Sequence, residues 1–254
     1  PECLAARNKL YQWQKANRDF TEQTGLRRDY AREFIGTKDG KQPRGLEIFI
    51  PENVTDINKW GKYVKGIDLE KTKVADSMNF NNADNGKPNP QFKLKGGGTN
   101  CQSATVAYYA RTLGYDVQAR TRINNVYMNA LAYNTSLAYK DIRTGLNPKY
   151  IIPNVKDKKS LYDWLFNNLG EEKLHTFQFS WKGKKEGHIV NVWKNKNGNV
   201  VIYDPQPDVK DTYKYFKMDK FYFDSININS VKLLALSTCI LDKDFVKHVL
   251  EKSK

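Results

Sequence analysis

The sequence predicts an α+β fold in which a helix carrying Cys101 packs on an antiparallel sheet carrying His188 and Asp204, with a helical segment before it. Three observations support this. With 39% hydrophobic and 13% aromatic residues in 254, the chain can build a substantial core. Residues 101–113 contain no Gly or Pro. Two later strand-like runs flank an Asn-Gly turn, the usual signal of a hairpin.

The cysteines and the charge exclude several classes of protein. Three cysteines, Cys3, Cys101 and Cys239, are an odd number without zinc-type spacing, so we expect a reducing compartment, no disulfide framework, no metal and no cofactor. The net charge of +14 would attract anionic partners. Because the lysines are dispersed, the charge predicts a solvated basic surface with at most weak nucleic-acid contact.

The distribution of apolar residues argues against a membrane span and a signal peptide. No stretch approaches the roughly 18 consecutive apolar residues of a membrane span, and the opening "PECLAARNKL" has no apolar region typical of a signal peptide. The first residue is not Met. We therefore expect a chain without a membrane span that is a piece of a longer protein.

Residues 4–35 predict an amphipathic helix interrupted near Gly25. Their apolar residues recur at spacings of three and four, at Leu10, Trp13, Ala16 and Phe20. The Gly/Pro/Lys-rich residues 36–45 predict a linker. We therefore expect a helical segment with its linker over 1–45 and a catalytic domain over 46–254.

Short elements alternate from residue 46 onward. "LEIFIP" predicts a strand, "DINKWGKYVKGIDL" a helix weakened by its glycines, and the Asn/Gly/Pro-rich residues 79–98 a long loop. The helix over 101–113 places Val106, Tyr109 and Leu113 on one face and ends at Gly114, a natural C-cap.

Cys101 is predicted to lie in the first turn of that helix, because Thr99 or Asn100 can supply the N-cap oxygen. The positive end of a helix stabilises a thiolate, and the preceding Gly96–Gly98 would let backbone N–H groups approach a substrate. A lone cysteine in a helix is, however, more often a packed apolar residue. The nucleophile hypothesis therefore needs a partner.

His188 is the best candidate among three histidines. His175 precedes an alternating strand and His248 lies in a lysine-rich segment expected to be a C-terminal helix, so we expect both to be structural. His188 follows Gly187 and opens the strand "HIVNVWK", which the turn "NKNGN" joins to the strand "VVIYDPQ".

The register of this hairpin decides which residue meets His188. A three-residue type I turn with Gly198 in the left-handed position places Gln206 opposite His188 and Asp204 diagonally on the same face. A two-residue loop would move Asp204 to the other face. Either residue could orient the imidazole, but an ionised carboxylate also stabilises the imidazolium, which favours Asp204.

Cys, then His, then Asp is the order of a papain-like constellation, in which the histidine activates the thiol and the third group orients the histidine. The oxyanion formed on attack needs two donors. The backbone N–H of Cys101 is the natural first donor. The second could come from the glycine loop, including Gly98, or from the side chain of Asn100 or Gln91, although Gln91 lies ten residues upstream.

Two blocks, "TNCQSATVAYYARTLGYDVQA" and "GHIVNVWKNKNGNVVIYDPQPD", resemble the papain-fold toxin domain with predicted glutamine deamidase activity. The family motif falls on Asn100, Cys101, Gln102, Arg111, Gly114, Tyr115, Gly187, His188, Asp204, Pro205 and Gln206. The resemblance implies a papain-like fold, a Cys101–His188–Asp204 triad, and substrate or oxyanion contacts from Asn100, Gln102, Gly98 and Gln206. Many relatives carry a second cysteine where this chain has Ala104, so the nucleophile here must be Cys101.

Residues 7–33 resemble the end of tailed-phage minor capsid proteins, in a Trp-Gln pair and a "TGLRR" stretch. This resemblance implies a papain-like cargo domain attached to a phage head protein, a capsid or portal partner, and a place in the virion or the host bacterial cytoplasm. From its residues alone, the segment is a basic amphipathic helix that could equally be a plain packing helix.

We therefore expect a cysteine hydrolase that deamidates a glutamine of a protein substrate. A papain-like peptidase shares every step up to the thioester and differs only in its leaving group. The remaining alternative is a virion structural or DNA-contacting head protein that has no catalytic activity.

Overall fold

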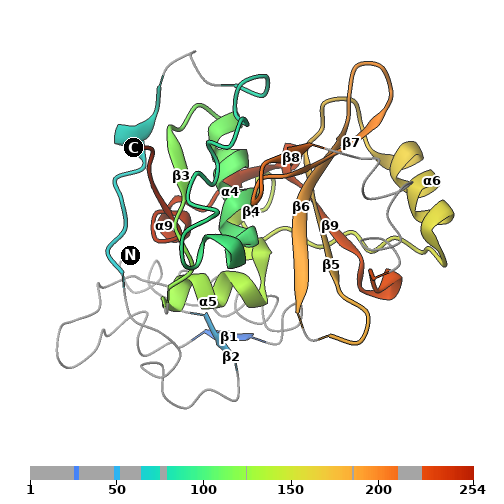
Figure 1. Ribbon diagram of the computed structural model, residues 1–254, viewed down its shortest axis with the longest axis horizontal. Coiled ribbons are helices and arrows are strands. Elements are labelled where there is room, and N and C mark those ends of the chain that lie inside the picture. The colour runs from blue at the N-terminus through green and yellow to red at the C-terminus, as the bar shows by residue number, and fades with distance from the viewer. Residues whose placement is uncertain are drawn as a thin grey trace, which may run out of the picture.

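The computed structural model describes residues 26–28, 49–51, 64–74, 79–123, 125–184, 186–210 and 225–254. In these ranges helices lie beside an antiparallel five-stranded sheet, and three further pairs of short antiparallel strands accompany it (Figure 1). The predicted α+β class is confirmed.

The main sheet has the strand order β8-β7-β6-β5-β9, and each neighbouring pair is antiparallel. Its strands are β5 (His175–Ser180), β6 (Gly187–Lys194), β7 (Val200–Asp204), β8 (Val209–Lys210) and β9 (Lys232–Ala235). Buried aliphatic and aromatic residues fill β6 and β7, so both faces of the sheet are covered.

Helix α4 (Cys101–Thr112) lies between β6 and the strand β3 (Val117–Ala119) (Figure 1). It is buried around almost its whole circumference from Ser103 to Arg111. The expectation of a single apolar face including Leu113 was wrong, because the helix is enclosed on several sides while Leu113 is 41% exposed. Gly114 adopts the left-handed conformation (φ 90°) that ends the helix, as predicted.

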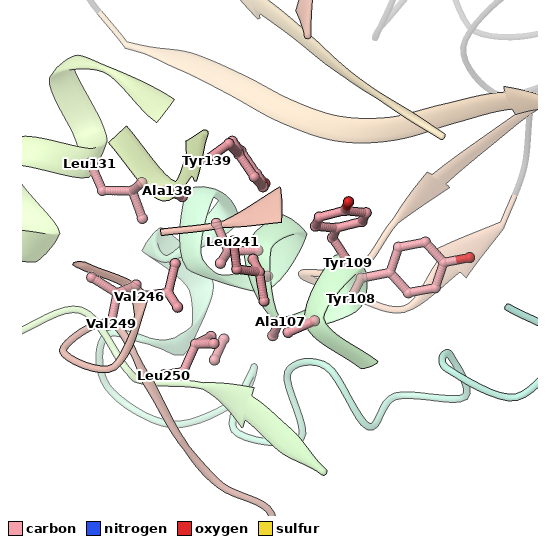
Figure 2. Packing of buried hydrophobic residues seen from close by; sticks show 14 of the residues in the cluster. Ala107, Tyr108, Tyr109, Leu131, Ala138, Tyr139, Leu241, Val246, Val249 and Leu250 are labelled. Carbon is pink, nitrogen blue, oxygen red and sulfur yellow. The ribbon is translucent and has the colours of Figure 1, made fainter. Parts of the chain in front are cut away.

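One apolar core surrounds α4. Figure 2 shows Ala107 and Tyr109 of α4 within a cluster completed by Leu131, Leu241 and Leu250. The elements that supply this core are α5 (Val126–Tyr133), β4 (Tyr139–Asp141), β10 (Cys239–Leu241), α9 (Lys243–Val246) and β11 (Leu250–Lys252). Tyr108, on the sheet side of α4, meets the ring of Tyr203 at 4.8 Å between centroids.

A second apolar core joins the other face of the sheet to α6 (Lys158–Asn168). Leu161 and Leu165 of this helix are fully buried against residues such as Val190. Asp157 and Ser160 form a reciprocal capping box that fixes where α6 begins. Two cores on opposite faces therefore hold the β6–β7 hairpin in place.

The N-terminal prediction needs one correction. Leu26–Arg28 form a strand, β1, antiparallel to β2 (Phe49–Pro51), because the ladder satisfies backbone groups that a helix would have satisfied internally. β2 lies inside the predicted strand "LEIFIP". The rest of the predicted helix over 4–35 and the linker over 36–45 lie outside the described residues, and the boundary at residue 45 stays a prediction.

Two further helix predictions fail where the structure describes them. Residues 64–69 are not helical, and a 3-10 helix follows over Glu70–Thr72; residues 56–63 lie outside the described ranges. The C-terminal segment has only the short helix α9 and then turns into β11, which pairs with β3. Within the described residues, no helix is long and apolar enough to cross a membrane.

Candidate active site

Cys101 is the first residue of α4, and Asn100 is the N-cap. The expected side-chain cap is absent, because Thr99 donates to Gly96 O and the Asn100 amide is used elsewhere. Asn100 Nδ2 donates to Arg120 O (3.2 Å) and to Asn89 Oδ1 (3.0 Å). The backbone N–H groups at the start of α4, the end of the helix that carries the Cys101 thiol, therefore have no capping side chain.

The three glycines before Cys101 differ in how closely other atoms approach them. Gly96 has φ 84°, and a Cβ there would lie 2.5 Å from Arg122 O. A Cβ on Gly97 would lie 1.9 Å from Gln91 O. Only Gly98 is exposed with room around it. The first two glycines therefore let the loop pack against its own chain, and Gly98 is the one of the three with space for a substrate beside it.

The β6–β7 hairpin has the three-residue loop that the sequence predicts. Asn195 N donates to Asn199 O (2.9 Å), and Gly198 is left-handed (φ 76°). The resulting register pairs Lys194 with Val200 and continues to Asn191 with Tyr203. The predicted register is confirmed, and the ladder stops before His188 reaches a direct partner.

His188 and Asp204 form a close pair. His188 Nε2 lies 2.6 Å from Asp204 Oδ2, with only 11% and 7% of the two side chains exposed. The other carboxylate oxygen accepts the backbone N–H of Gln206 (3.1 Å). The diagonal neighbour therefore holds the imidazole, and the carboxylate is itself fixed by the turn that follows β7.

The environment of His188 favours its charged form. Burial lowers the pKa, but the Asp204 carboxylate and a hydrogen bond to the Cys101 side chain raise the pKa of His188 to about 10. Because Nε2 is bound to Asp204, Nδ1 is the ring nitrogen left for Cys101. The structure thus brings together the three residues that the sequence separates by up to 103 positions (204 − 101).

Two aromatic rings cover the imidazole. Trp181 stacks on His188 with 6.2 Å between centroids and 14° between planes, and Phe179 presents its edge at 6.0 Å. These rings shield the His188–Asp204 pair from water, which strengthens its electrostatic interaction. Neither aromatic residue was singled out from the sequence, where they belong to the alternating strand β5 and its end.

The other expected site residues divide into two groups. Gln102 is half-buried, and its Oε1 accepts from the Cys101 thiol at 3.3 Å. Gln206 is buried, and its Nε2 lies 3.4 Å from Asn100 Oδ1, so its amide contacts the start of α4 and not His188. Gln91 hydrogen-bonds Glu251, which occupies its amide away from the thiol.

Asn89 is a residue of this region that the sequence did not indicate. It is 3% exposed, and its amide contacts Gly97, Asn100 and Gln206. It lies in the loop over 79–98, where several asparagines have the same turn-forming character, so no local pattern distinguishes it.

The remaining histidines and Cys239 are structural, as expected for the histidines. His175 is buried with Nδ1 2.8 Å from Lys173 O, and burial lowers its pKa. His248 stacks on Tyr127 and places Nδ1 2.7 Å from Val64 O, and burial lowers its pKa to about 4. Burial raises the pKa of the Cys239 thiol to about 11. Cys3 lies outside the described residues.

Among the residues that the structure describes, no group of three or more His, Cys, Asp or Glu side chains could hold a metal ion.

Arg111, one of the motif positions, is buried inside the fold, where it donates to Ala83 O (2.9 Å) and pairs with Asp116 (3.2 Å). These contacts connect α4 to the loops that contain Ala83 and Asp116.

Comparison with known proteins agrees with this geometry. Residues 99–207 match the family model described as papain fold toxin 1, glutamine deamidase. No curated protein matches the chain. The matched range includes Cys101, His188 and Asp204 and runs from the start of α4 to the turn after β7. The fold of this part of the chain is therefore papain-like α+β, and residues 99–207 are similar to the glutamine deamidase toxin family.

Proposed function

We propose that this chain is a cysteine-dependent hydrolase that converts a glutamine side chain of a protein substrate to glutamate, with Cys101, His188 and Asp204 as its triad. The observation that carries the proposal is the 2.6 Å contact between His188 Nε2 and Asp204 Oδ2, on an imidazole that also contacts the helix-terminal Cys101. A buried cysteine that only filled space would have no need of this pair.

The reaction follows from these contacts. The thiol proton resides on His188, whose charged form the site favours, and the Cys101 sulfur attacks the carboxamide carbon. His188 then gives that proton to the leaving nitrogen, so ammonia departs and a thioester remains. Water, deprotonated by His188, attacks the thioester; the carbon–sulfur bond breaks and the thiol regains its proton. Asp204 keeps the imidazole oriented and stabilises its positive charge throughout.

Oxyanion stabilisation is assigned to Gln102 and to the backbone at the start of α4. The side chains of Asn100 and Gln206 hydrogen-bond each other, and that of Asn100 also bonds Asn89, so they support the loop instead. Gln102 Oε1 accepts from the Cys101 thiol, so the Nε2 of the same amide is the donor that could turn toward an oxyanion, and the N–H of Cys101 has no capping side chain. The exposed Gly98 leaves room for substrate at this point.

A peptidase would use the same residues, and the leaving group alone distinguishes it. The family match favours deamidation and a protein substrate. The test is incubation of the full chain with bacterial cytosolic proteins, followed by mass spectrometry. We expect glutamine-to-glutamate mass gains with intact backbones, absent with Cys101→Ala. New peptide termini would identify a peptidase, and no change in any protein would contradict catalysis.

The N-terminal resemblance supports a proposal about where the enzyme works. We propose that the segment over 1–45 associates with a phage capsid or portal, and that the papain-like domain is an effector carried in the virion to the host bacterial cytoplasm. Co-sedimentation of the full chain with phage heads tests the first part; a chain that remains in the supernatant at low and high salt contradicts it.

A further inference from the structure

The side chain of Asn89 joins the two chain segments that carry the nucleophile and the acid. We propose that Asn89 is a positioning residue, which holds Cys101 and Asp204 at the separation that the His188 ring can bridge. This inference rests on the proposed function and adds to it a residue from outside the matched range 99–207.

The contacts of Asn89 lead to both segments. Its Nδ2 lies 3.0 Å from Gly97 O and 3.2 Å from Asn100 Oδ1 on one side, and 2.8 Å from Gln206 O on the other. Its Oδ1 accepts from Asn100 Nδ2 at 3.0 Å. A short side chain that donates to two segments and also accepts must be an amide here, because Ser and Thr have one donor hydrogen, Asp has none, and Leu has neither donor nor acceptor.

Each contacted residue is one step from the catalytic groups. Asn100 is the N-cap immediately before Cys101, and Gln206 donates its N–H to the same Asp204 carboxylate that holds His188. Asn89 therefore closes a ring of contacts that runs through Asp204, His188 and Cys101 and returns through Asn100. If Asn89 is removed, the helix start and the turn after β7 lose its shorter contacts and keep the 3.4 Å contact between Gln206 Nε2 and Asn100 Oδ1, so the separation of the two segments is held less firmly.

Asn89 is itself fixed by the fold. Its own N–H donates to Gly86 O (3.3 Å), and the neighbouring Pro88 O accepts from Ala119 N (2.7 Å) at the end of β3. β3 is paired with β11 beside the core around α4. Because the residue next to Asn89 is hydrogen-bonded to the packed strand β3, the Asn89 side chain is held at a fixed position beside the site. An amide on a loop without such contacts would not be fixed in this way.

The test uses the full chain with Asn89→Leu, which removes the hydrogen bonds without adding charge, and with Asn89→Ser, which is smaller and retains a polar group. The matched control is Asn82→Leu, an exposed residue of the same loop that accepts from Asn79 N. Two properties are measured well below the melting temperature: the rate of Cys101 alkylation by iodoacetamide against pH, and the ring titration of His188 by NMR.

We expect Asn89→Leu to slow Cys101 alkylation at about pH 6 by roughly tenfold or more, because the sulfur loses its contact with the His188 ring. The His188 titration should move down by about one unit or more for the same reason. Asn89→Ser should lie between wild type and Asn89→Leu, and Asn82→Leu should match wild type.

A purely structural Asn89 would give a different result. The Asn89 variants would then melt at lower temperature but keep the wild-type alkylation profile and His188 titration, and the positioning proposal would be overturned. Failure of the proposed function is distinguishable, because it appears as a wild-type chain that deamidates no protein. In that case the His188 titration still decides the role of Asn89.

Discussion

Asn191 of β6 lies directly opposite Tyr203 of β7, and this pairing places His188 and Asp204 on the same face of the hairpin. A slip of one residue would turn Asp204 to the opposite face and leave the imidazole without its carboxylate. The three-residue loop closed by Gly198 prevents that slip. The position of Asp204 beside His188 therefore depends on the geometry of the turn that contains Gly198.

Asp204 and Gln206 can be separated by mutation. Asp204→Asn should lower turnover by roughly three to four orders of magnitude, because an amide cannot stabilise the imidazolium. Gln206→Ala should cost only about tenfold, because the backbone N–H to Asp204 and the backbone O to Asn89 remain. Steady-state deamidation rates check this. A larger loss for Gln206→Ala would transfer the third position of the triad to Gln206.

Cys101→Ala should abolish deamidation while the chain still unfolds in one cooperative transition. The sulfur contacts Gln102 and His188 at the end of a helix, so its loss leaves the apolar core intact. Cys239→Ala is the matched control, since that thiol lies in the core and donates to Ala235 O (3.2 Å). It should lower the melting temperature and leave turnover unchanged. Unfolding of the Cys101→Ala chain at ordinary temperature would show a packing role for the thiol.

Gly97→Ala and Gly98→Ala should give opposite outcomes. At Gly97 the new Cβ would fall 1.9 Å from Gln91 O, so the loop before Cys101 must move and the chain should lose stability and activity together. At Gly98 the nearest atoms are 3.8 and 3.9 Å away, which is ordinary contact. Thermal melts and turnover of the two variants test this. Equal destabilisation by both would contradict the assigned tasks of the glycines.

The His188–Asp204 pair should make stability depend on alkaline pH. The pKa of His188 is about 10 in the folded chain against an ordinary value of 6.5, so folding retains a proton that the unfolded chain releases. The contribution is complete below about pH 6.5 and disappears as pH rises through 10. Urea unfolding of wild type and Asp204→Asn should show a stability gap that narrows over this window. A constant gap would mean that His188 is not held in its charged form.

Removal of residues 1–45 should leave the melting transition of the papain-like domain in place. The deletion removes β1 but none of the residues that the structure describes in the two apolar cores. Differential scanning calorimetry of the truncated and full chains tests the predicted boundary. A drop of more than a few degrees would show that the N-terminal segment is part of one folded unit.

The sequence by itself determined the local features of this site. The Gly- and Pro-free run placed Cys101 in the first turn of a helix, and a three-residue Asn-Gly turn predicted the hairpin register, because both depend on backbone conformations of adjacent residues. That register put Gln206 opposite His188 and Asp204 diagonally beside it, and the charge of Asp204 favoured the pair that the structure contains. The two motif blocks resemble the same family whose model matches residues 99–207.

Tertiary structure decided what local patterns could not. The side chain of Asn100 looks like a helix cap in sequence, yet it bonds to Asn89 and Arg120, because partners from other segments compete for the same amide. The last residues carry a helical pattern but form β11, since β3 offers an open edge that pairs with them. The contacts of Asn89 form only when its own loop, the start of α4 and the turn after β7 come together in the fold. No spacing along the chain predicts that these three segments meet.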